Sequence, residues 1–70
     1  MEKLKIQEYR KLIKILSDNK HYLSQSIEEK AADILESIRM EAEDKKCRVS
    51  KAKINLINTP QGPQIGVNFE

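Results

Sequence analysis

The sequence is poor in the residues from which small proteins build covalent or metal-based cross-links. Among its 70 residues there is one cysteine, Cys47, and one histidine, His21. A single cysteine excludes a disulfide within the chain, and these two residues cannot supply the ligands of a structural zinc site. We therefore expect no metal and no cofactor. We also expect part of the stability of so short a chain to come from association with another chain.

Segments that would direct the chain to or through a membrane are also missing. Residues 1–5 mix charged and apolar side chains, and no apolar run approaches the roughly 18 residues of a membrane span. The sequence shows no signal peptide. Together with the single cysteine, this pattern predicts a cytoplasmic protein without a membrane partner.

Catalytic motifs are absent as well. Gly62 and Gly66 are the only glycines, so the sequence has no glycine-rich phosphate loop. His21 and Cys47 are the only candidates for a base and a nucleophile, but they fall in different connecting segments without an orienting motif. The carboxylates of residues 28–44 fall on the polar face of an expected helix, which is an ordinary solvated surface. We predict that the chain is not an enzyme and has no catalytic residues.

What the sequence does contain is helical periodicity over two segments. From about residue 2 to 17, apolar side chains recur at spacings of three and four, as one face of a helix requires. A second helix is expected at about 20–46, where Ser26 and Glu29 have the spacing of a capping box. The first apolar stripe comprises Ile6, Tyr9, Leu12, Ile13 and Leu16, and the second comprises Ile27, Ala31, Ile34, Leu35, Ile38 and Ala42.

After Cys47 the apolar period changes to two, which is typical of half-buried strands. We predict strands at about 49–57 and 65–70, joined by a turn at 58–64 whose Thr-Pro-Gln-Gly sequence suits a reversal. One register pairs every apolar residue, and it sets Ala52 opposite Phe69, Ile54 opposite Val67 and Leu56 opposite Ile65.

The predicted fold class is α+β. It is a two-helix hairpin followed by an antiparallel β-hairpin (ααββ), in a single domain of residues 1–70. A two-stranded hairpin alone in water is marginal, so its apolar face needs a cover. The helix pair is one cover, and a second copy of the chain, which would complete the fold by dimerisation, is the other.

Three apolar residues lie off the helical stripes. The final strand carries no lysine, a residue that on an edge strand opposes pairing with another chain. These features predict contact with another chain. We expect the partner or dimer interface to comprise Leu4, Ile15, Met40, Ile65, Val67 and Phe69.

Charge is distributed unevenly, although the net charge is only +2. Residues 1–20 carry a net charge of +3, residues 21–46 of −3 and residues 47–70 of +2. The opposite charges of the first two blocks are typical of neighbouring helices whose flanks attract each other. The alternative is a nucleic-acid surface, with contacts from Lys3, Arg10, Lys11, Lys14, Arg48, Lys51 and Lys53.

The expected order of elements, with the tip Asn58-Thr59-Pro60-Gln61-Gly62, resembles the bacterial histone-like DNA-bending proteins. Those proteins are dimers whose β-ribbon arms carry a proline-bearing tip. The resemblance lies in the element order, and it implies contact with DNA through the hairpin. The chain departs from the family because no basic residue follows residue 53, whereas a phosphate-binding arm is strongly basic.

These observations predict a small non-catalytic protein-binding module that self-associates and acts as a regulator, inhibitor or accessory factor. The expected partners are a second copy of the chain and a further protein that the sequence does not identify. One alternative is a dimeric nucleic-acid-binding protein, and another is an oligomer that sequesters a small anionic ligand. The composition, rich in Lys, Glu, Ile and Asn, is typical of a low-GC bacterium or one of its phages.

Overall fold

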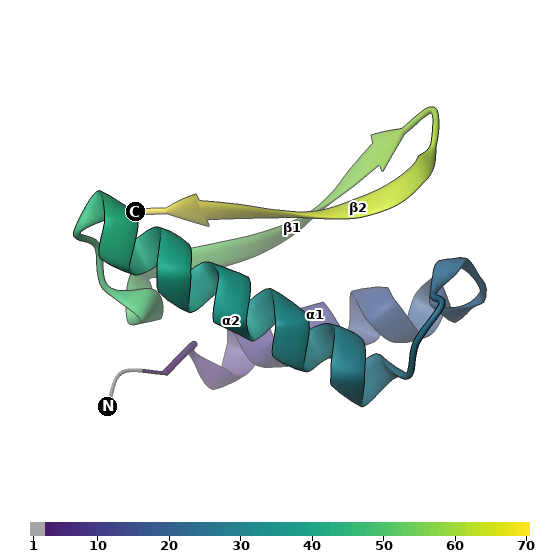
Figure 1. Ribbon diagram of the computed structural model, residues 1–70, viewed down its shortest axis with the longest axis horizontal. Helices are drawn as coiled ribbons and strands as arrows, with labels where there is room; N and C mark the ends of the chain where they lie inside the picture. The colour runs from purple at the N-terminus through teal and green to yellow at the C-terminus, as the bar shows by residue number, and fades with distance from the viewer. Residues whose placement is uncertain (1–2) are drawn as a thin grey trace.

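Two helices and a β-hairpin form two layers in the computed structural model, which describes residues 3–70 (Figure 1). In chain order the elements are α1 (Ile6–Asp18), the 3-10 helix η1 (Lys20–Tyr22), α2 (Ile27–Lys45), the 3-10 helix η2 (Val49–Lys51), β1 (Ala52–Thr59) and β2 (Gly62–Phe69). The hairpin lies across one face of the helix pair. This arrangement confirms the predicted α+β fold class.

The capping box fixes the start of α2. Ser26 Oγ accepts a hydrogen bond from the Glu29 N–H at 3.2 Å and donates one to Glu29 Oε1 at 3.1 Å. The Glu29 carboxylate therefore accepts a hydrogen bond from the hydroxyl of Ser26. In a standard capping box it accepts one from the backbone amide of the N-cap residue. The helix ends at Lys46, whose φ of 57° is left-handed. The following residue, Cys47, donates its N–H to the Ala42 carbonyl at 2.8 Å, which satisfies one of the last helical acceptors.

Both helices begin later than the periodicity predicts. The first begins at Ile6 because Lys5 has an extended backbone with ψ of 145°. Residues 1–2, where the predicted helix would begin, lie outside the described part of the chain. The second begins at Ile27, since Ser26 is extended with ψ of 160° and separates α2 from η1. The expectation of one helix from residue 20 is therefore wrong.

The strands pair antiparallel in the predicted register, with Ala52 opposite Phe69, Ile54 opposite Val67 and Leu56 opposite Ile65. The alternation of apolar and polar residues determines this register, because a slip of one residue would turn one apolar set to the opposite face.

The turn of the hairpin is tighter than the predicted range 58–64. Thr59 pairs with Gly62, so that only Pro60 and Gln61 lie between the strands. Thr59 Oγ1 accepts from the Gln61 N–H at 3.2 Å and donates to the Gly62 carbonyl at 2.7 Å. These bonds close the loop, and the φ of +121° at Gly62 requires glycine. At the other end β1 starts at Ala52 rather than at residue 49, because η2 occupies the preceding residues.

The core lies between the two layers, and three elements each contribute one large, fully buried side chain. These side chains are Leu12 of α1, Ile38 of α2 and Ile54 of β1. The predicted stripe of α1 is partly wrong, because Ile6 is 70% exposed and Tyr9 is 41% exposed. Since α1 must face both β1 and α2, its buried side is turned away from the centre of that stripe.

Candidate functional site

An apolar groove runs between α1 and α2 on the side of the helix pair turned away from the hairpin. Its volume is about 520 Å³. The buried Leu12 faces the core, and Ile6 points roughly 120° away from it around the helix. The groove is lined by Lys3, Leu4, Ile6, Tyr9, Ala32, Leu35, Glu36, Arg39 and Val49. Ile6 is the most exposed large hydrophobic side chain among residues 3–70. The helix pair is therefore apolar on both faces, and only one of them is covered.

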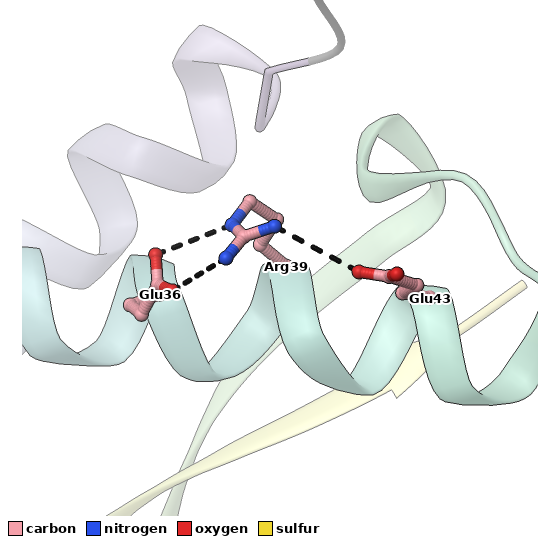
Figure 2. Close-up of polar contacts among 3 residues, drawn as sticks. All are labelled: Glu36, Arg39 and Glu43. Atoms are coloured by element: carbon pink, nitrogen blue, oxygen red, sulfur yellow. Dashed lines mark hydrogen bonds and ion pairs between the residues drawn. The ribbon is translucent and has the colours of Figure 1, made fainter.

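Acidic side chains and one arginine border the groove along α2. Arg39 donates through Nε and Nη2 to the two carboxylate oxygens of Glu36, at 3.2 and 2.5 Å (Figure 2). Its Nη1 lies 3.8 Å from a carboxylate oxygen of Glu43. The hydrogen bonds from Arg39 hold the pKa of Glu36 below its ordinary value. These exposed pairs contribute little to stability, but they fix the guanidinium beside the groove.

The corresponding side of α1 is basic. Arg10 and Lys14 are exposed, and within residues 3–70 neither has an ion-pair partner. A shallow depression beside them continues the groove from Tyr9 to Ser17. Across the described residues, no ion pair joins α1 to α2. The opposite charges of α1 and α2 therefore do not pair with each other within the described chain.

Glu8, the buried carboxylate of α1, was not among the residues predicted from the sequence. Its Oε1 accepts a hydrogen bond from the Ile54 N–H at 2.8 Å and lies 3.3 Å from Lys11 Nζ, and the residue is only 3% exposed. The bond from Ile54 lowers the pKa of Glu8, burial opposes this, and Lys11 and Lys53 lower it further. Glu8 precedes Leu12 by one helical turn, so its place on the buried face was visible in the spacing. Its hydrogen-bond partner, the Ile54 amide, lies far along the chain and was not visible in the spacing.

Glu8 covers the outer edge of β1, and the outer edge of β2 has no such cover. The Glu70 N–H donates to the Lys51 carbonyl at 3.1 Å. The antiparallel alternation then turns the backbone groups of Ile65 and Val67 away from β1. Within residues 3–70 these outward groups have no hydrogen-bond partner. The β2 edge is therefore a second surface at which another chain could add.

The six apolar residues predicted to form an interface do not lie on one surface. Leu4 lines the outer groove, whereas Ile15 and Ile65 line a cavity between the helices and the hairpin. Met40 is 59% exposed and lies outside the groove. The remaining two, Val67 and Phe69, are partly buried against the core.

The ring of Phe69 is also covered by a cation. Lys45 Nζ lies 5.8 Å from the centroid of the Phe69 ring, which is within the range of a cation–π contact. The end of β2 is thus held over the end of α2.

The predicted nucleic-acid contacts do not lie on one face. Lys53 alternates with the inward-facing Ala52 and Ile54, so it lies on the outer face of the hairpin, and Lys51 ends η2 directly before the strand. Arg10 and Lys14 lie on the side of α1 away from the core. The others are spread around the molecule, with Lys11 bound to Glu8, Lys3 at the groove and Arg48 before η2. The structure therefore does not gather the basic residues into a stripe along one face.

The catalytic candidates also lie apart. The His21 ring lies 4.3 Å from the ring of its neighbour Tyr22, and the exposed Cys47 thiol lies 3.6 Å from the Lys45 carbonyl. In the part of the chain that the structure describes, no three His, Cys, Asp or Glu side chains are grouped to hold a metal ion. Nor does any described helix have the length and apolar character needed to cross a membrane.

No family model, curated protein or solved structure was found to match this chain.

Proposed function

We propose that this chain is a small protein-binding module that self-associates through the groove between α1 and α2. The observation that carries this proposal is the 70% exposure of Ile6 beside a groove of about 520 Å³. Apolar patches of this kind mark interaction surfaces. Burying one isoleucine side chain stabilises an assembly by roughly 1.5–3 kcal/mol, so that even a few groove residues favour association.

A second copy is the partner that the charges favour. On the outer face, α1 presents Arg10 and Lys14, whereas α2 presents Glu36 and Glu43 with Arg39 paired between them, which leaves one negative charge in excess. A two-fold axis brings the same surface of both subunits together. If α1 of one subunit lies over α2 of its partner, cations meet carboxylates at two symmetric places. The charges of α1 and α2, which form no ion pairs with each other inside one subunit, would then be matched between subunits.

The small core supports the same conclusion. Within residues 3–70 the buried hydrophobic core has seven residues, and three of them are alanines. Chains of this length with so little buried apolar surface are marginal alone. A dimer through the groove would extend the core by covering Leu4, Ile6, Tyr9 and Leu35.

In this proposal the protein acts by occupying a surface of a further protein, as regulators, inhibitors and accessory factors do, and it catalyses no reaction. It works in the cytoplasm, where its exposed Cys47 remains a thiol. Nucleic-acid binding is less well supported, because the predicted basic contacts do not lie on one face and phosphate recognition needs them together.

Sedimentation analysis of two matched variants tests the groove. Ile6→Glu places a charge in the groove, and Ile57→Glu places the same charge on the outer face of the hairpin, where Ile57 is 47% exposed. We expect wild type and Ile57→Glu to sediment as dimers and Ile6→Glu as a folded monomer. A monomeric wild type, or an Ile6→Glu dimer as stable as the control, would contradict the proposal.

Charge exchange tests the arrangement of the helices. One chain carries Arg10→Glu and Lys14→Glu, and the other carries Glu36→Lys and Glu43→Lys. We expect each chain alone to dimerise weakly and the mixture to form a heterodimer, because both contacts between α1 and α2 are then oppositely charged. If the mixture associates no better than the separate chains, α1 does not lie over α2 of the partner.

A further inference from the structure

The hairpin diverges from the helices towards its tip (Figure 1). Along the inward face of β1, side-chain exposure rises towards the tip, because Ala52 and Ile54 are buried whereas Leu56 is 43% exposed. The right-handed twist of two-stranded ribbons explains why the sheet leaves a flat helix layer. A cavity of about 380 Å³ lies beneath the far half of the hairpin, and we call it the hairpin cavity.

An aromatic side chain lines the hairpin cavity near the tip of the hairpin. Tyr22 belongs to η1, and its ring lies against Gly62, where an added Cβ would be 3.4 Å from Cδ1. The wall is mainly apolar, with Ile15 from α1, Leu56 from β1 and Ile65 from β2. The cavity is thus bounded by α1, η1, α2 and both strands.

Among the described residues, Lys30 of α2 is the only charged side chain that lines the hairpin cavity. It is partly buried, and no carboxylate within residues 3–70 forms an ion pair with it. Of the two polar neighbours in the wall, Asn19 is already engaged, because its side chain donates to the Ile15 carbonyl at 2.9 Å. An unpaired cation at the edge of an apolar cavity is the chemical complement of an anion attached to an apolar body.

We infer that the hairpin cavity binds an amphipathic organic monoanion, of the chemical class of a medium-chain carboxylate. The carboxylate pairs with Lys30 Nζ, and the alkyl chain lies between Ile15, Leu56 and Ile65. A volume of about 380 Å³ falls within the range of small-ligand sites. The cavity shares no lining residue with the groove between α1 and α2, so this inference does not depend on the proposed dimer.

Three amphiphiles with the same alkyl chain test the charge requirement, namely decanoate, decanol and decyltrimethylammonium below their aggregation concentrations. Backbone amide shifts and calorimetry report the place and strength of binding. We expect the affinities to fall in that order, with shifts at residues around Lys30 and Leu56. In Lys30→Met, decanoate should bind roughly fivefold more weakly while decanol is unaffected. Equal affinities for decanoate and decyltrimethylammonium would overturn the assignment of Lys30.

Two tryptophan variants test the location. Leu56→Trp fills the cavity, whereas Ile57→Trp adds the same ring to the outer face, because neighbouring strand residues point to opposite faces. We expect Leu56→Trp to abolish binding of decanoate and Ile57→Trp to retain it. If both variants bind decanoate as wild type does, the ligand is not in the hairpin cavity. The same titrations on monomeric Ile6→Glu should give unchanged affinities, which separates this result from the fate of the dimer.

Discussion

The Glu8 carboxylate of α1 accepts a hydrogen bond from the Ile54 amide of β1 at 2.8 Å. This hydrogen bond joins the helix layer to the hairpin, and it lies beside fully buried apolar side chains. An ionised carboxylate at this depth is tolerated because it accepts the amide bond and pairs with Lys11. The strand edge that it covers would otherwise have an unsatisfied donor.

Replacing Glu8 by Gln should destabilise the protein by about 1–2 kcal/mol at neutral pH, because the Gln amide oxygen can still accept the bond from Ile54 but lacks the charge that strengthens it and that pairs with Lys11. The folded-state pKa of Glu8 lies below its ordinary value of 4.5, chiefly because of the bond from Ile54. The stabilisation by the charge is therefore complete above about pH 4.5 and is lost as the pH falls through the lowered pKa. Urea unfolding of wild type and Glu8→Gln should show a large difference at pH 7 and a smaller one at pH 3.

Glu41→Gln is the matched control, because it removes a solvent-accessible carboxylate that pairs with Lys45 and lies outside the groove. Solvent screens that pair, and we expect little change in stability at either pH. Protein concentration must be equal in all samples, since dimerisation would shift the midpoint. A Glu8→Gln difference that is the same at both pH values would contradict the role given to its charge.

Lys46→Gly should raise the stability of the protein. Lys46 has a left-handed backbone with φ of 57°, which costs a residue with a Cβ roughly 1 kcal/mol relative to glycine. We expect a rise in Tm of roughly 4 °C by circular dichroism. Ser37→Gly, within the right-handed body of α2, should lower Tm instead. An equal effect of the two substitutions would mean that helix propensity outweighs the backbone geometry at residue 46.

The hairpin could be predicted from sequence because its information is local. The alternation of apolar residues determines which faces meet, and the Thr-Pro-Gln-Gly sequence predicts the reversal. The predicted length of the turn was wrong, because the side chain of Thr59 closes it with hydrogen bonds to Gln61 and Gly62. The presence of polar residues at 58–64 indicated a long loop, although most of them continue the strands.

The orientation of α1 could not be predicted in the same way. Its stripe includes Ile6 and Tyr9, which look like core residues in the sequence, and the structure exposes both. The buried Glu8 has its partner 46 residues away, and no local pattern indicates such a contact. The groove was missed for the same reason. Whether an apolar side chain faces the hairpin or the solvent depends on how two layers meet.

A proline at position 67 distinguishes the groove from the free edge of β2 as the route to a dimer. The Val67 amide points away from β1, so losing its N–H breaks no bond within the hairpin. The preceding Gly66 also relieves the restriction that proline places on its neighbour. Because the proposed interface is the groove, Val67→Pro should remain dimeric in sedimentation, with only a modest loss of stability from the smaller side-chain contact. If Val67→Pro is a folded monomer, while Ile6→Glu remains a dimer, the subunits associate by adding strand to strand, and the apolar groove is left for a different protein.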